Sequence, residues 1–314
     1  MARRLEPIPT GLVHRACNDG RMVRTPRDLT SDDIVLGHFT LGRSYPLSER
    51  LAVAAEAGVA GVGLFMGDIE RWASDEQLAA MLDEYGLLLV DLDLINLAPH
   101  DAPTRERSER FVQRAVALAD RFGCRYLQTI APHVEPGAAT RAETIDALGR
   151  VADRVAPSGM EVGLEYTGFT TVSTAADAAA IAAACGRPNV GVCVDIWHHT
   201  RASGGVELSS AVAPAMVRCV QVDDGPLIPV EPDYKLDCLR NRLAPGEGEM
   251  DVAHRLAELM TMGVDVPWTI EVCRDDAELA EGRGRAHVLR CVAATRAVLS
   301  EARARLAQDS ARIT

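Results

Sequence analysis

The sequence lacks long apolar runs, and no stretch approaches the roughly 20 residues that a bilayer-spanning helix requires. Its first residues, MARRLEPIPTG, are basic but contain no apolar segment, so we expect no secretion signal. The eight cysteines include no C-x-x-C pair, and several lie in strand-like runs where a thiol acts as a small apolar side chain. We therefore expect a cytoplasmic protein with no membrane partner and no disulfide framework.

Positive charge is also scarce, because 33 Lys and Arg residues face 45 Asp and Glu residues, for a formal net charge of −12. Proteins that bind nucleic acid normally present a basic face, so we expect no nucleic-acid partner. A Gly-rich phosphate fingerprint is missing as well. It would be expected after the first strand-like run, and the segment there, LGHFTLGRS (36–44), does not supply one. This absence argues against an open, doubly wound dinucleotide-binding sheet.

Apolar strand-like runs and amphipathic helical segments alternate from residue 34 onward. About eight such units of roughly 30 residues predict a (β/α)₈ TIM barrel, whose active site lies at the carboxyl ends of the strands. Residues 1–30 are polar, Arg-rich and interrupted by prolines, so we expect an N-terminal extension followed by a barrel catalytic domain over 31–314. The expected strands are 34–39, 60–65, 87–95, 125–130, 159–165, 189–195, 216–221 and 267–271, and the expected helices are 47–58, 74–86, 104–123, 140–157, 174–186, 249–263 and 285–308.

Four polar side chains each end one of the last four strand-like runs: Glu165, Asp195, Gln221 and Glu271. Two of them have an alternative role when taken alone, since Glu165 could cap a helix and Gln221 could hydrogen-bond a neighbouring strand, whereas Asp195 and Glu271 have little reason to follow an apolar strand unless they bind something. Their recurrence at successive strand ends, which meet at one edge of the barrel, favours a divalent-metal site.

Other polar residues follow the same strand ends. His198 can face the same pocket as Asp195, as a metal ligand, a supporting partner or a substrate contact. Arg242, which precedes the turn PGEGEMD, could clamp substrate oxygens, and His133 after the fourth strand is a further candidate substrate contact. Of Asp223 and Asp224, we expect one to support the site and the other to form a turn. We expect His38, His100 and His199 to be structural.

These segments together resemble the xylose-isomerase-like barrel superfamily, which includes sugar epimerases, inosose dehydratase and relatives of endonuclease IV. The matching pieces are GLEY (163–166), VDIWHH (194–199), VQVDDG (220–225), Arg242 with PGEGEMD (245–251), and TIEV (269–272). The resemblance implies one divalent metal held by Glu165, Asp195, residue 221 and Glu271. It further implies that Glu165 and Glu271 form an acid/base pair.

The same resemblance implies substrate contacts from His198 and Arg242, and its D-x-W-H-H-x-R form adds Arg201. Gln221 stands where many members of the superfamily carry His. An all-oxygen ligand set is harder than one with imidazole, so Mn²⁺ or Mg²⁺ is the expected cofactor. The endonuclease branch is disfavoured, because its multi-metal site needs additional His ligands and a basic DNA-binding surface.

The sequence therefore predicts a metal-dependent isomerase, epimerase or lyase that removes the proton α to the carbonyl of a keto-sugar, inositol or glycoside. The acidic loops after the seventh and eighth strands predict an unphosphorylated substrate. Two alternatives remain open: a metal-dependent hydrolase, and a non-catalytic sugar-binding or subunit-partner barrel. The expected partner is a small polyol, sugar or glycoside, and a homo-oligomer or a paired subunit is compatible with the sequence. The sequence does not select the reaction outcome.

Overall fold

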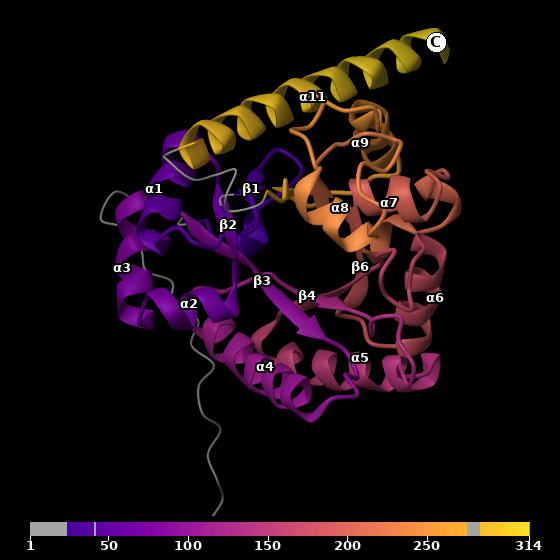
Figure 1. Cartoon of the computed structure of the whole chain (residues 1–314). Helices are drawn as coiled ribbons and strands as arrows, with labels where there is room; N and C mark the ends of the chain where they lie inside the picture. The colour runs from indigo at the N-terminus through magenta and orange to yellow at the C-terminus, as the bar shows by residue number, and fades with distance from the viewer. Residues whose placement is uncertain (1–23, 41, 275–282, 314) are drawn as a thin grey trace, which may run out of the picture.

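Eight parallel strands close into a barrel in the computed structural model, which describes residues 24–40, 42–274 and 283–313 (Figure 1). Each strand pairs with the next along the chain, and β8 returns to pair with β1. The strands are β1 Ile34–Leu36, β2 Gly61–Phe65, β3 Leu88–Asn96, β4 Tyr126–Ile130, β5 Glu161–Glu165, β6 Val190–Asp195, β7 Val217–Val222 and β8 Trp268–Ile270. The predicted (β/α)₈ fold is confirmed.

Helices surround this barrel, and the last of them, α11, runs along its outside (Figure 1). The α-helices are α1 Leu47–Ala57, α2 Met66–Trp72, α3 Asp75–Tyr85, α4 Ala102–Phe122, α5 Arg141–Val155, α6 Ala175–Cys185, α7 Ile196–Ala202, α8 Tyr234–Arg240, α9 Val252–Thr261 and α11 Arg283–Ile313. Four 3₁₀ segments accompany them: η1 Pro26–Asp28, η2 Ala156–Ser158, η3 Leu208–Ser210 and η4 Pro214–Met216. Within the described residues, no helix combines the length and apolar character needed to cross a bilayer.

Local capping signals account for two of these helix starts. Ser74 accepts a hydrogen bond from the backbone N–H of Gln77, and the Gln77 side chain accepts one from the backbone N–H of Ser74. Thr140 and Glu143 make the same reciprocal pair at the start of α5. Each box satisfies two of the free N–H groups of a first helical turn, so the sequence pattern alone located both boundaries.

The described part of the expected N-terminal extension packs against the barrel. Leu29 is buried with Val35 and Val90, and its backbone oxygen accepts a hydrogen bond of 2.8 Å from Nη1 of Arg125. Residues 1–23 lie outside the described residues, so the domain boundary at residue 30 stays a prediction.

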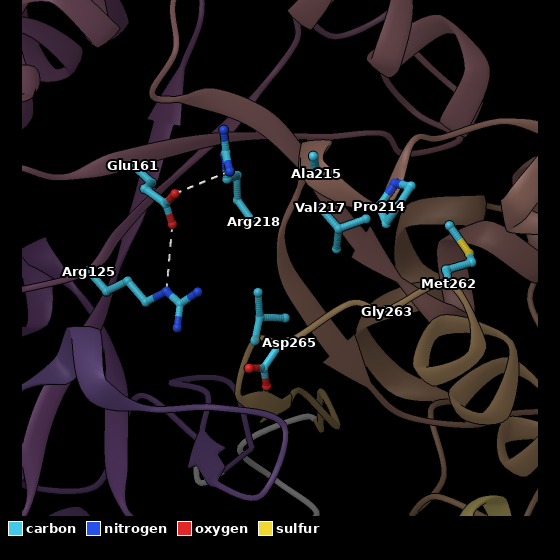
Figure 2. Close-up of a pocket in the computed structure, with 10 residues that line it drawn as sticks. Arg125, Glu161, Pro214, Ala215, Val217, Arg218, Met262, Gly263 and Asp265 are labelled. Atoms are coloured by element: carbon cyan, nitrogen blue, oxygen red, sulfur yellow. Dashed lines mark ion pairs between the residues drawn. The ribbon is translucent and has the colours of Figure 1, made fainter. Parts of the chain in front are cut away.

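The amino ends of the strands enclose a cavity of about 370 Å³, shown in Figure 2. Glu161, the first residue of β5, lies there with its carboxylate 3.6 Å from Nε of Arg125 and 3.3 Å from Nη1 of Arg218. The residues that the sequence singled out for chemistry lie at the other ends of the strands. The ion pairs of Figure 2 therefore belong to the framework of the barrel rather than to its candidate active site.

Candidate active site

Strand order brings three of the predicted residues into one buried group. Glu165 ends β5, Asp195 ends β6, and His198 lies in the first turn of α7, which begins directly after β6. One ligand-type atom from each residue lies within 4.8 Å of the other two. Asp195 also caps α7, because its Oδ1 accepts a hydrogen bond of 2.8 Å from the backbone N–H of His198. This cap fixes His198 beside Asp195.

Gln221 lies on β7 directly beside Asp195 of β6 and is buried. Its Nε2 donates a hydrogen bond of 3.2 Å to Oε1 of Gln128, and Nε2 of Gln128 in turn donates to Oε2 of Glu165. Gln128, on β4, therefore links Gln221 to Glu165, and sequence reasoning did not identify it. The signal available for it was an amide inside the otherwise apolar segment YLQTI (126–130).

Glu271, directly after β8, lies in a second buried group. Its partners are His38, which follows β1, and Asp93 of β3, and one ligand-type atom from each of the three lies within 4.8 Å of the others. Neither His38 nor Asp93 was among the predicted site residues. Two acids alternate in the apolar run LLLVDLDLI (87–95), and alternation places Asp91 and Asp93 on the same face of a strand. That pattern could have indicated an inward-facing carboxylate.

Arg242 is buried at the centre of the site. Its Nη1 donates to Oδ2 of Asp195 at 2.7 Å, to Oδ2 of Asp223, and to the backbone oxygen of Glu271 at 2.9 Å. One guanidinium thus connects the ends of β6, β7 and β8. Asp223 also accepts a hydrogen bond of 2.9 Å from the backbone N–H of Trp197.

The neighbouring residue, Asp224, organises the turn that follows Arg242. Its two carboxylate oxygens accept four hydrogen bonds of 2.8–3.1 Å, from the backbone N–H groups of Gly225, Gly246, Gly248 and Met250. A Cβ at position 248 would lie 2.3 Å from an Asp224 oxygen, and Gly246 has a φ of +84°. Both glycines are therefore required for the backbone to wrap this closely around the carboxylate.

His198 is held as a neutral ring between several partners. Its Nδ1 lies 2.8 Å from the hydroxyl of Tyr234, and its Nε2 lies 3.3 Å from Nη2 of Arg242 and 3.7 Å from Oε1 of Glu165. Burial, together with the charge of Arg242, lowers the pKa of His198 to about 4. Since Arg242 can only donate, Nε2 accepts and Nδ1 carries the proton.

The remaining predicted contacts have different surroundings. The side chain of Arg201 is only 5% exposed, and it pairs with Asp237 at 2.5 Å and donates to the backbone oxygen of Pro226 at 3.0 Å. His133 is partly buried, with its ring centroid 5.4 Å from that of Phe169. His199 is buried and bonded to the Tyr166 hydroxyl at 3.1 Å, as expected of a structural histidine.

The electrostatics of the site are dominated by buried carboxyl groups. Burial, with the neighbouring charge of Asp195, raises the pKa of Glu165 to about 8. Burial, with the charges of Asp93 and Glu165, raises the pKa of Glu271 well above its usual value. Burial also opposes ionisation of Asp195, but the adjacent Arg242 and His198 outweigh it and hold the pKa of Asp195 low.

This donor set fits a divalent cation. Glu165, Asp195 and His198 present two carboxylates and one imidazole whose ligand atoms already lie together, and the amide of Gln221 lies on the neighbouring strand. Several acidic groups crowd around one buried arginine, so a cation here would offset repulsion that otherwise favours protonated carboxyls.

The raised pKa values predict that the metal-free protein loses stability as the pH rises from about 5 to 8. In this window Glu165 is protonated in the folded chain and ionised in the unfolded chain, so unfolding releases a proton and becomes easier at higher pH. We expect a lower melting temperature at pH 8 than at pH 5.5 in chelator, and a larger stabilisation by added Mn²⁺ at pH 8. Melting curves of equal stability at both pH values, without metal, would contradict this electrostatic account.

Comparison with known proteins identifies the family. The family model described as xylose isomerase-like TIM barrel matches residues 51–293. The chain belongs to this family. The resemblance inferred from the strand-end residues is thereby confirmed.

Two curated relatives share 25% sequence identity with the chain over the aligned residues. The chain is 25% identical over 256 residues to a 3-dehydroshikimate dehydratase of Pseudomonas aeruginosa, and the matched region covers 79% of this chain and 39% of that protein. It is 25% identical over 138 residues to an inosose isomerase of Bacillus subtilis, covering 43% of this chain and 48% of that protein. The chain thus spans less than half the length of these relatives. Their names agree with the sequence-based assignment to a sugar isomerase, epimerase or dehydratase class.

Among solved structures, an IolI protein described with a bound zinc atom superimposes with a TM-score of 0.70 at 17% identity. The superposition covers 86% of this chain and 98% of that one. Identity this low supports the shared barrel fold and no finer statement.

Proposed function

We propose that the protein is a divalent-metal-dependent enzyme that dehydrates a hydroxylated six-membered carbocyclic ketone, with 3-dehydroshikimate as the first substrate to test. The observation that supports this most strongly is the buried group of Glu165, Asp195 and His198 at the carboxyl ends of β5 and β6. The dehydratase relatives match a larger share of the chain than the isomerase relatives do. Their named compounds share a ketone and hydroxyl groups on a six-membered carbon ring.

The metal ligands in this proposal are Glu165, Asp195, Gln221 and Glu271, and Mn²⁺ or Mg²⁺ suits their oxygen donors. A divalent cation held there would polarise the substrate carbonyl as a Lewis acid, which acidifies the adjacent C–H group.

The acid/base roles fall to Glu165 and Glu271. One carboxylate takes the proton from the carbon α to the carbonyl. The hydroxyl group on the β carbon then leaves with its bonding electrons, accepts a proton from the other carboxyl group and departs as water, while a carbon–carbon double bond forms between the α and β carbons. His198 and Arg242 contact substrate oxygens in this proposal, and His133 and Arg201 are further candidate contacts.

The function is tested with the metal-loaded protein in D₂O, followed by NMR. We expect 3-dehydroshikimate to lose water, and inosose to exchange the proton α to its ketone or to isomerise. Hydrolysis of esters or phosphodiesters without proton exchange would favour the hydrolase alternative. Bound metal and bound sugar with neither reaction would favour the non-catalytic alternative. Elemental analysis in the same preparation should give one divalent ion per chain.

An unphosphorylated substrate is a separate expectation. Arg242, in the connection after β7, is already paired with Asp195 and Asp223, and a phosphate dianion would meet the surrounding carboxylates in a dry site. Matched free and phosphorylated keto-sugars, assayed with Mn²⁺, should show a kcat/KM at least about tenfold higher for the free member. A preference for the phosphorylated member would contradict this expectation.

A further inference from the structure

His38 and Asp93 form a buried pair that the proposed reaction does not use. Nδ1 of His38 lies 2.7 Å from Oδ2 of Asp93, and the two residues are only 5% and 4% exposed. The His38 ring is also fixed by aromatic neighbours. It lies nearly parallel to the Phe65 ring with centroids 5.8 Å apart, and its centroid lies 3.9 Å from that of Phe39. The pair therefore presents its other polar atoms in a fixed direction.

Those other atoms, Nε2 of His38 and Oδ1 of Asp93, have no hydrogen-bond partner among the described residues, and both are buried. Leaving a buried polar atom without a hydrogen-bond partner destabilises the folded protein. Most such atoms in folded proteins have a partner, so a pair of them on adjacent side chains indicates a ligand from outside the chain.

The pair lies beside the catalytic carboxylates. A ligand-type atom of Glu271 lies within 4.8 Å of those of His38 and Asp93. Asp93 also acts electrostatically on both Glu165 and Glu271, and its charge contributes to the raised pKa of each. A molecule positioned between Glu165 and Glu271 would therefore be within reach of the pair.

The chemistry of the pair selects its ligand. Nδ1 of His38 is taken up by its contact with Asp93, so Nε2 of His38 and Oδ1 of Asp93 are the atoms left for a ligand. A hydroxyl group can donate to a carboxylate oxygen and can exchange a hydrogen bond with a ring nitrogen, so it matches both atoms. A phosphate or carboxylate group offers no donor and would be repelled by Asp93.

We infer that His38 and Asp93 bind hydroxyl groups of the substrate away from its reacting carbonyl, and so select polyhydroxylated rings. This inference rests on the proposed function, because it concerns the substrate of the same site. It assigns a specificity role to one residue that follows β1 and one residue of β3, whereas the proposed metal ligands lie on β5, β6 and β7 and directly after β8.

The test measures binding without turnover. The probes are myo-inositol, shikimate and their monodeoxy analogues, none of which carries the reacting ketone, titrated calorimetrically into Mn²⁺-loaded protein. For the wild-type protein, at least one deoxy analogue should bind at least about tenfold more weakly than its parent, because it leaves a buried acceptor unpaired. In the double variant His38→Phe/Asp93→Leu, parent and analogue should bind within about threefold of each other.

Tyr126→Phe is the matched control, because the Tyr126 hydroxyl is also buried without a partner but packs inside the barrel with Cys193 and Cys219. This variant should keep the wild-type difference in affinity between each parent compound and its deoxy analogue. If the double variant melts early, Asp93→Asn replaces it, and a reduced discrimination is still expected.

Unchanged discrimination in these variants, or failure of the wild-type protein to bind any probe, would overturn the inference. Loss of one metal ion per chain in the double variant would overturn it in favour of a cation site. Failure of the proposed function would instead show as probe binding with normal discrimination but no turnover of the ketones.

Discussion

Replacing Glu165 or Glu271 by glutamine is expected to lower kcat/KM for the proposed dehydration by at least about 10²-fold, the low end for loss of a positioned acid or base. Glutamine keeps the shape and one oxygen of each side chain but cannot accept the proton from the substrate or return one. Both variants should be assayed at saturating Mn²⁺ with metal content measured in parallel, so that weaker metal binding is separated from lost proton transfer.

Proton exchange in D₂O adds a second readout that assigns the two roles. Loss of the base should abolish both exchange and dehydration, whereas loss of the acid should leave exchange and slow only the departure of water. The matched control is Glu161→Gln, on the same strand as Glu165 but at the amino end of the barrel, where its partners are Arg125 and Arg218. Wild-type activity in both site variants would remove these carboxylates from the mechanism.

Replacing Arg242 by methionine should strongly destabilise the metal-free protein. Asp195 and Asp223 would remain buried without their counter-charge, and breaking a buried ion pair in this way costs about 3–5 kcal/mol. Since about 1 kcal/mol shifts the melting temperature by a few degrees in a chain of this size, a fall of roughly 5–10 °C is expected. Added Mn²⁺ should recover part of the loss, because a bound cation offsets the same negative charge.

Arg187→Met provides the control for burial. Arg187 makes two hydrogen bonds with Asp153, of 3.0 and 2.9 Å, but both side chains are about half exposed. Exposed pairs contribute about 0–1 kcal/mol, so this variant should melt close to the wild type. Equal shifts for the two variants would show that Arg242 contributes no more than a surface arginine.

The sequence predicted the barrel because its evidence is local and repeated. The capping boxes at Ser74 and Thr140 mark helix starts within four residues of chain, and the apolar runs mark the strands. The short helices α2, α7 and α8 were not predicted, because each has only seven residues and lies in a connection after a strand. Periodicity needs a longer window than that.

The candidate site was predicted where a residue type and its place at a strand end were sufficient. Glu165, Asp195 and His198 are brought together by consecutive elements, so their proximity followed from the fold. Arg242 and the His38–Asp93 pair could not be placed in the same way. Their surroundings come from strands separated by many residues, and whether a charged side chain is buried and paired depends on those distant partners.

The turn around Asp224 has a consequence for how specificity could change in this family. Four backbone N–H groups converging on one carboxylate form a nest, the kind of concavity that proteins use to cradle phosphate. Here the chain supplies its own anion, so the nest is filled from within. If a small residue replaced Asp224, the same four backbone N–H groups would have no carboxylate to bind. The residue type at position 224 therefore decides whether these four N–H groups are satisfied from within the chain.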